Sequence, residues 1–205
     1  MGNLGHFDPT LQARGVNGLT NGAKMDKIVW DEFDGKRELL AEEYDKVRAK
    51  LDGKDPAVAA DDVIKTPPGL DAVHLAKYRK NQSFFRESVL SAYNGACCIT
   101  GINDSRLLVA SHIRPWSKCK NGEDRTKTEN GLCLSALYDR AFDKGLFTVD
   151  EHFKIKLSSS LKDHLTKDSY DQHFAWLDNL EITLPSRGKP AADFLHYHNQ
   201  NVFVA

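Results

Sequence analysis

The spacing of apolar residues predicts helices in the first part of the chain. Over residues 24–51, apolar side chains recur every three or four positions on two successive faces, formed by Met25, Ile28 and Val29 and then by Leu40, Tyr44, Val47 and Leu51. We therefore expect two helices or one kinked helix here. Residues 52–70 contain turn formers and few large apolar groups, which is typical of a linker. This pattern divides the chain into an N-terminal helical segment with its linker, 1–70, and a second unit, 71–205.

A third helix is predicted over residues 72–93, and one side of it is basic. Arg79, Gln82 and Arg86 follow one another at spacings of three and four residues, which places them on the same side of a helix. Two interpretations of this side stay open: contact with a phosphate backbone, or a solvated charged face.

Two short apolar runs follow the third helix and predict a β-hairpin. They cover 97–100 and 107–110, and a turn-prone stretch separates them. The second run leads directly to Ser111 and His112. After a polar, basic loop, the pattern predicts a short helix at 135–144, a second hairpin from 146–149 and 153–157, and helical segments near 161–178 and 191–200. Helices combined with small hairpins make an α+β fold.

The composition of the 205 residues is that of an ordinary folded protein, with 40% apolar residues, 28% charged residues and a net charge of −1. No stretch approaches the roughly 20 apolar residues of a membrane-spanning helix, and the N-terminus lacks the apolar core of a signal peptide. We therefore expect a cytoplasmic protein without membrane contact. The four cysteines lack the paired CxxC spacing of a structural zinc site, so they are predicted to be reduced, partly buried thiols: Cys97, Cys98, Cys119 and Cys133.

Four polar residues of the central region suggest hydrolytic chemistry. His112 ends a predicted strand, Asn130 stands at the next turn, and a predicted helix carries Asp139 and Asp143 four positions apart. Residues four apart share a helix face, so the two carboxylates can point at one divalent cation, for which Mg²⁺ or Mn²⁺ is the best match. A histidine near that cation can deprotonate a water that attacks phosphorus. This arrangement suits the hydrolysis of phosphodiester bonds.

The strings that contain these residues resemble bacterial HNH endonucleases of the restriction type, which are ββα-metal nucleases. The similarity covers about residues 75–150 and rests on CCITG at 97–101, LLVASHIRPW at 107–116 and NGLCLSALYDRAFDKG at 130–145. It implies a ββα core at about 95–145 that cleaves double-stranded DNA with a divalent metal, in restriction or anti-phage defence. It also implies that His112 is the general base, that Asn130 orders the loop and orients the base, and that Asp139 ligates the metal. In the related colicin-type nucleases, the position of Asp143 is a further ligand.

Two positions depart from the family pattern. Ser111 stands where many ββα-metal nucleases have a metal-binding acid or histidine, and Tyr138 occupies a place often filled by histidine. These departures keep open a second interpretation, a DNA-binding module whose nuclease site has decayed, and a nuclease that acts on RNA is a third. His198, near the C-terminus, is a candidate for a displaced site residue, although an amphipathic end helix explains it as well.

Basic residues near the predicted site are expected to contact the substrate. Arg114 follows the predicted base closely, so we expect it to touch phosphate, with Trp116 packing in the core. Together with Arg79, Gln82 and Arg86 it forms the predicted set of DNA contacts. An enzyme that cuts both strands usually dimerises to match a two-fold site, so a homodimer is an open expectation.

Overall fold

The computed structural model describes residues 72–205, except 121 and 122, and scattered residues before them. Those earlier residues are 7, 12–13, 24–34, 36, 39–40, 43–44, 46–47 and 51, and the side chains of 24 and 72–80 are not described. The chain divides into two compact units, residues 1–56 and 57–205. The predicted linker, 52–70, lies outside the described residues, so the domain boundary at residue 70 stays a prediction.

The first unit contains the helix α2, Lys24–Phe33, in the part of the chain where the apolar spacing predicts a helix. An ion pair joins Lys27 Nζ to Asp31 Oδ2 at 2.8 Å across one turn of its surface. Such an exposed pair adds only about 0.3–0.5 kcal/mol to helix stability. The second predicted face, around Leu40, falls on residues that are described only in part.

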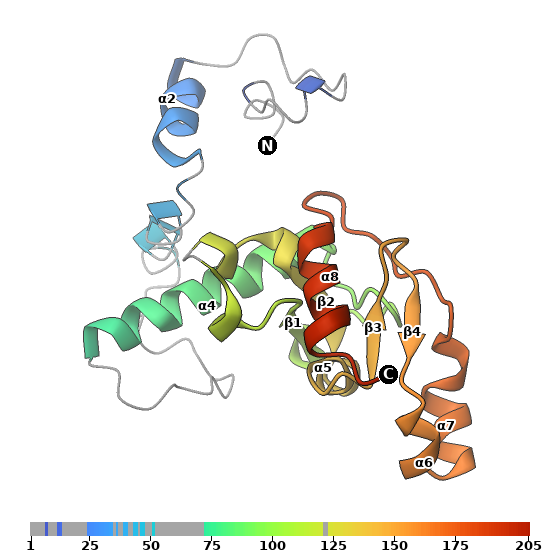
Figure 1. Cartoon of the computed structure of the whole chain (residues 1–205). Coiled ribbons are helices and arrows are strands. Elements are labelled where there is room, and N and C mark those ends of the chain that lie inside the picture. Colours follow the sequence, from blue (N-terminus) through green and yellow to red (C-terminus); the bar gives the residue numbers. More distant parts are fainter. Residues whose placement is uncertain are drawn as a thin grey trace. The chain divides into compact units, whose positions relative to one another are not determined.

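The second unit is built around a short antiparallel pair of strands. The helix α4, Ala72–Ala92, precedes β1, Leu108–His112, which pairs with β2, Gly131–Ser135 (Figure 1). The helix α5, Ala136–Asp143, starts directly after β2 and packs against both strands. Leu108 pairs with Ser135, so His112 pairs with Gly131 at the other end of the strands. Helices and small sheets together give this unit an α+β fold.

The hairpin predicted from the two apolar runs after α4 is wrong. The first run, which begins at Cys97, forms turns, and β1 takes β2 as its partner instead. The Cys97 amide donates to the Ile102 carbonyl at 2.8 Å and the Gly101 amide donates to the Cys97 carbonyl at 2.9 Å, so this segment closes on itself. A further bond, from the Cys98 amide to the Cys133 carbonyl at 2.8 Å, ties the segment to β2. The apolar run is therefore buried as a turn and not as a strand.

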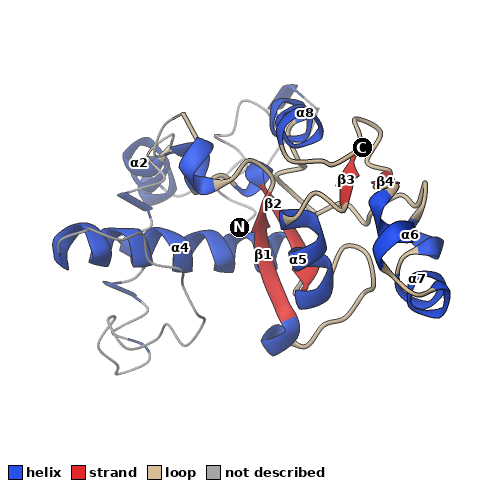
Figure 2. Ribbon diagram, turned by 60° about the horizontal axis from the view of Figure 1, so that its bottom comes forward, coloured by secondary structure: helices blue, strands red, loops and turns tan. Residues whose placement is uncertain are grey.

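The C-terminal part of the second unit confirms the predicted second hairpin and end helices. Its strands β3, Phe147–Val149, and β4, Ile155–Leu157, pair antiparallel. The helices α6, Ser160–His164, α7, Lys167–His173, and α8, Ala192–Asn201, follow in order (Figure 2).

One hydrophobic core joins the strands to the C-terminal helices. It includes buried side chains of α4, β2, α5, β3 and α8, namely Phe85, Val89, Leu132, Leu134, Phe142, Phe147, Phe194 and Leu195. Gly145 allows the C-terminus to approach α5 closely, because its φ is +67° and a Cβ there would collide with the Val202 carbonyl. The C-terminal extension thus completes the core of the segment that carries His112.

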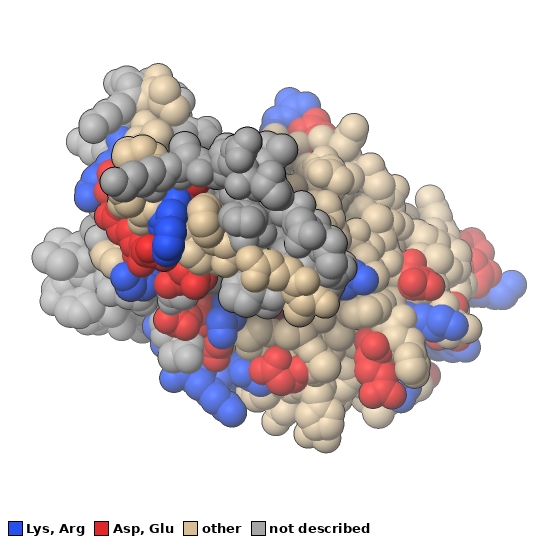
Figure 3. Space-filling view, turned by 90° about the horizontal axis from the view of Figure 1, so that it is seen from above, with Lys and Arg blue, Asp and Glu red and all other residues tan. Residues whose placement is uncertain are grey.

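The charged side chains on one face of the described surface are mixed in sign. On the face in Figure 3, Lys and Arg side chains lie next to Asp and Glu side chains. This mixing agrees with a net charge of −1 for the whole chain. None of the helices in the described part of the chain is long and apolar enough to cross a membrane.

Candidate active site

His112 is the last residue of β1, and aromatic rings contact it on two sides. The ring of Phe85, from α4, stacks on the imidazole with a centroid distance of 3.7 Å and an interplanar angle of 16°. Trp116 meets the imidazole edge-on at 5.6 Å. Gly131 makes room for this packing, since a Cβ there would collide with Val89 Cγ2 and lie 3.0 Å from the Phe85 ring. The imidazole is therefore fixed between α4 and the loop that follows β1.

The hydrogen bonding of His112 selects one form of its ring. Nε2 lies 2.9 Å from the carbonyl oxygen of Arg125, which can only accept, so Nε2 carries the proton and donates it. Burial lowers the pKa of His112 from 6.5 to about 4, although the bond to the Arg125 carbonyl opposes part of this shift. The ring is therefore neutral at pH 7. Among the described residues, no hydrogen bond engages Nδ1, which leaves this atom able to accept a proton.

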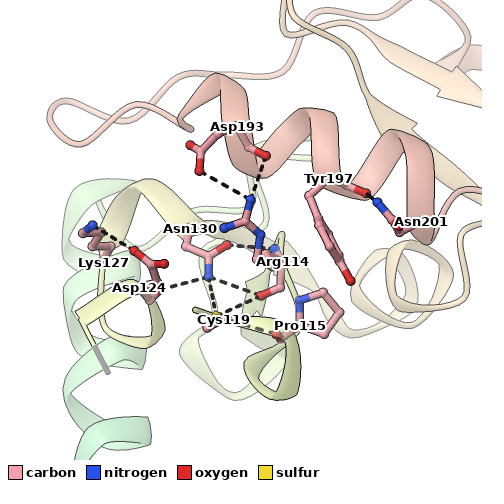
Figure 4. A network of polar contacts seen from close by, with 9 residues as sticks. All are labelled: Arg114, Pro115, Cys119, Asp124, Lys127, Asn130, Asp193, Tyr197 and Asn201. Atoms are coloured by element: carbon pink, nitrogen blue, oxygen red, sulfur yellow. Dashed lines mark hydrogen bonds and ion pairs between the residues drawn. The ribbon is translucent and has the colours of Figure 1, made fainter. Parts of the chain in front are cut away.

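Asn130 organises the loop between β1 and β2. Its side chain is fully buried; Oδ1 accepts from the Arg114 amide at 2.8 Å, and Nδ2 donates to the Arg114 carbonyl at 3.2 Å. Nδ2 also donates to the Asp124 carbonyl at 3.0 Å, one residue before the carbonyl that holds His112. Figure 4 shows this amide between the two arms of the loop. Asn130 therefore acts on His112 through the loop backbone, as a positioning residue.

Arg114 lies inside the protein and not on its surface. Its side chain is 7% exposed, and its guanidinium is 3.4 Å from the carboxylate of Asp193 on α8 (Figure 4). The rings of Phe194 and Tyr197 lie 4.8 Å and 5.0 Å from the guanidinium carbon. The side chain faces α8 and its charge has a partner within the protein, so a phosphate contact of Arg114 stays a prediction. Arg114 anchors α8 to the loop.

The predicted basic side of α4 is used, in part, for contacts within the protein. Arg86 donates to the carbonyls of Leu108 at 2.7 Å and Ser105 at 2.9 Å, and so joins α4 to the start of β1. Gln82 is half-buried, and the side chain of Arg79 lies outside the described residues. A role of this side in DNA binding stays a prediction.

Asp139 and Asp143 lie one helical turn apart on α5. Asp139 is half-buried in the first turn, and Asp143 is the exposed last residue of the helix. In the described part of the chain, no three His, Cys, Asp or Glu side chains gather into a group that could hold a metal ion. Two carboxylates nevertheless fit Mg²⁺ or Mn²⁺, since Mg²⁺ is usually held by one or two carboxylates and keeps several waters.

Ser111 presents a buried polar atom next to His112 in the sequence. Its side chain is 2% exposed, and its hydroxyl oxygen has no hydrogen-bond partner among the described residues. Side chains alternate across a strand, so this hydroxyl faces the opposite side of β1 from the imidazole. Buried hydroxyl groups are seldom left unpaired.

Tyr138 occupies the place where the family often has histidine, and it is a core residue here. Its hydroxyl donates to the His173 carbonyl at 2.9 Å. Its ring packs edge-on against Phe147, Phe174 and Trp176, with centroid distances of 6.1–6.5 Å. The tyrosine thus joins α5 to the C-terminal part of the core.

His198, on α8, is 1% exposed, and both of its ring nitrogens are engaged. Nε2 donates to the Phe142 carbonyl at 3.2 Å, so Nδ1 accepts from the Thr148 hydroxyl at 2.8 Å. The imidazole also stacks on the Phe142 ring at 3.8 Å. Burial lowers the pKa of His198 to about 4. His198 therefore links α8, α5 and β3, and this placement does not support a role as a displaced site residue.

The four cysteines are free and buried, which confirms the prediction of reduced thiols. Burial raises the pKa of Cys133 to about 12 and also raises the pKa values of Cys98 and Cys119. Thiols that stay protonated are poor nucleophiles, so these three cysteines are poorly suited to nucleophilic chemistry.

Sequence reasoning missed two residues of the site, Phe85 and Arg125. Phe85 fits the apolar spacing of α4 as well as Val89 does, and nothing local shows that it stacks on His112. Arg125 is one of several charges in a basic loop, and its contact with His112 is made by its backbone carbonyl, which carries no sequence signal.

Comparison with known proteins gives a family match and similar solved structures. Residues 97–150, which include β1, β2, α5 and β3, match the family described as HNH endonuclease. One of the solved structures is titled "Modification dependent TagI restriction endonuclease"; it is 20% identical over 58% of this chain and 37% of that chain, with a TM-score of 0.35. No curated protein matches the chain. The matched segment contains His112, Asn130, Asp139 and Asp143, so all four lie in the part of the chain that is similar to HNH endonucleases.

Proposed function

We propose that this segment hydrolyses phosphodiester bonds of double-stranded DNA in a reaction that depends on a divalent cation. The state of His112 carries the proposal. The ring is neutral, it is fixed by Phe85 and by the Arg125 carbonyl, and its Nδ1 is unengaged among the described residues. A positioned neutral imidazole with an open acceptor is the group that general-base catalysis needs.

In the proposed reaction, Nδ1 of His112 takes a proton from a water while the water oxygen bonds to phosphorus. The bond from phosphorus to the leaving oxygen breaks, and that oxygen takes up a proton. Asp139 and Asp143 would hold the divalent cation, which when bound stabilises the charge on the phosphate and on the leaving oxygen. Asn130 and the Arg125 carbonyl keep the imidazole in one orientation throughout.

The low pKa of His112 suits the free enzyme. At pH 7 the ring is neutral, so no proton has to leave before a water binds.

The biological setting that we propose is restriction or anti-phage defence in the cytoplasm, with a homodimer as the cutting form. This part of the proposal rests on the resemblance of three strings, at 97–101, 107–116 and 130–145, to restriction-type HNH proteins. A dimer would place two sites on the two strands of a duplex with two-fold symmetry.

The experiment that tests the proposed function compares plasmid DNA and structured RNA as substrates in EDTA, Mg²⁺ and Mn²⁺. We expect strand breaks in DNA only when a divalent cation is present, and a loss of about a hundredfold or more in the His112→Ala variant. His152→Ala is the matched control, because His152 is 75% exposed in the turn between β3 and β4. Cleavage in EDTA, cleavage of RNA alone, or full cleavage by His112→Ala would contradict the proposal.

A further inference from the structure

Arg125 frames the base of the proposed reaction with both its backbone and its side chain. Its carbonyl accepts the hydrogen bond from His112 Nε2 at 2.9 Å. Its guanidinium carbon lies 5.3 Å from the centre of the Trp116 ring, and that ring meets the His112 imidazole edge-on. The positive charge of Arg125 therefore shares an aromatic neighbour with the imidazole.

The guanidinium of Arg125 has no negative partner among the described residues. Its Nε is buried without a hydrogen bond, and the side chain is only partly exposed. Two other basic side chains of the same region are paired: Arg114 with Asp193 at 3.4 Å, and Lys127 with Asp124 at 2.9 Å. A partly buried charge without a partner is costly, so the protein keeps this one in a state that an anion would stabilise.

The chemistry of arginine identifies the anion. A guanidinium presents several N–H donors in a plane, and these match two oxygens of a phosphate group. A ring that stacks beside it, here Trp116, holds that plane in one orientation. A phosphodiester that reaches the acceptor nitrogen of His112 comes close to this guanidinium, because both groups contact the same tryptophan ring.

We propose that Arg125 binds the phosphodiester group that His112 attacks through its water, and that it takes the role in phosphate binding that the sequence suggested for Arg114. This inference rests on the proposed function. Arg125 pairs with a non-bridging phosphate oxygen through its guanidinium, while its carbonyl keeps the base in place. One residue thereby fixes the distance between the base and the phosphorus.

The test measures binding and cleavage separately in three variants. Affinity for a DNA duplex is measured by fluorescence anisotropy at several salt concentrations in the uncleaving His112→Ala background, with and without Arg125→Gln. We expect the slope of log affinity against log salt to fall by about 0.9, the value for one lost phosphate contact. Arg106→Gln is the matched control, since Arg106 is an exposed arginine paired with Asp104, and it should leave the slope unchanged.

Single-turnover cleavage in the otherwise unchanged protein completes the test. We expect Arg125→Gln to cut at least tenfold more slowly than the wild type, and Arg125→Lys to keep the salt slope because it keeps the charge. An unchanged salt slope in Arg125→Gln would overturn the proposal. So would a change in the NMR signals of the His112 ring in free Arg125→Gln, because the residue would then act only by shaping the loop.

Failure of this inference and failure of the proposed function give different results. The salt slope is measured on binding alone and does not require that the protein cuts DNA. If His112→Ala cuts like the wild type, the proposed base is wrong, and the slope still shows whether Arg125 contacts phosphate. If His112→Ala is inactive and Arg125→Gln leaves the salt slope of binding unchanged, the proposed nuclease function is supported. The proposed contact between Arg125 and phosphate is then wrong.

Discussion

His112 and His198 occupy similar surroundings in two different regions of the second unit. Each ring stacks on a phenylalanine, at 3.7 Å on Phe85 and 3.8 Å on Phe142. In each, Nε2 donates to a backbone carbonyl, at 2.9 Å and 3.2 Å. Burial lowers the pKa of both to about 4. The two histidines are therefore alike in their ring stacking, in the hydrogen bond from Nε2 to a backbone carbonyl, and in the direction and size of their pKa shift.

The two histidines differ at Nδ1. In His198 this atom accepts a hydrogen bond from the Thr148 hydroxyl at 2.8 Å, whereas in His112 no described group engages it. A nitrogen that already accepts a hydrogen bond cannot take a proton from a water without losing that bond. Burial and a lowered pKa therefore do not by themselves distinguish the proposed base from a structural histidine, whereas the unengaged Nδ1 does.

The largest effect that we predict concerns α5, which carries residues of both the His112 region and the His198 region. Its Phe142 contacts His198, while its Asp139 and Asp143 are the proposed metal ligands. Asp139→Ala should abolish cleavage at any practical Mg²⁺ concentration, since few protein oxygens remain to hold the cation. Asp143→Ala should weaken cleavage and be partly rescued by more metal or by Mn²⁺. Cleavage is measured on plasmid DNA over a metal series.

The control for this prediction is the unfolding free energy of the two aspartate variants. The core around His198 contributes to this free energy, so the measurement shows whether the variants are still folded. Both aspartate variants should unfold in urea close to the wild type, because neither side chain belongs to the core. Full activity in Asp139→Ala with an unchanged metal dependence would move the site away from this carboxylate. It would also contradict the proposal that His112 and the α5 carboxylates form one catalytic site.

The next effect is a loss of stability in acid. The folded pKa of His198, about 4, lies below its ordinary value of 6.5, so the unfolded chain binds the proton more readily. Stability is therefore full above pH 6.5 and falls as the pH drops toward 4, by roughly 2 kcal/mol between pH 7 and pH 5 from this residue. Urea unfolding at the two pH values measures the loss. The fall in unfolding free energy between pH 7 and pH 5 should be smaller in His198→Gln and unchanged in His152→Ala. An equal fall in His198→Gln would show that protonation of His198 is not the cause.

The smallest effect is that of Thr148→Val, which removes the hydroxyl that bonds His198 Nδ1 and keeps the side-chain shape. A buried acceptor left without its donor costs about 1–3 kcal/mol. Urea unfolding should show this loss, and the cleavage rate per folded molecule should stay at the wild-type value. A large fall in that rate would mean that the His198 region takes part in catalysis.

The parts of the fold that sequence predicts are those that local spacing determines. The helix α4 follows from the apolar residues around Phe85 and Val89, and the hairpin of β3 and β4 follows from two runs around the turn at Asp150. His112 and Asn130 are recognisable because their neighbours form a familiar string. Each of these signals lies within a short window of the chain.

The parts that sequence reasoning failed to predict depend on partners far along the chain. β1 pairs with β2 across a loop of eighteen residues, and no local pattern distinguishes that partner from the nearer apolar run at Cys97. Arg114 is buried because Asp193, 79 residues away, comes to its guanidinium. The role of His198 depends on Thr148, 50 residues before it. Burial and pairing of this kind become visible only in three dimensions.

The most direct test of the central claim is the single-turnover cleavage rate of His112→Gln and of His198→Gln, measured on one DNA duplex in Mg²⁺ and corrected for the folded fraction. The open acceptor at Nδ1 predicts a loss of about a hundredfold or more for His112→Gln. For His198→Gln it predicts a lower unfolding free energy and a wild-type rate per folded molecule. Cleavage by folded His112→Gln within a few-fold of the wild type would contradict the account.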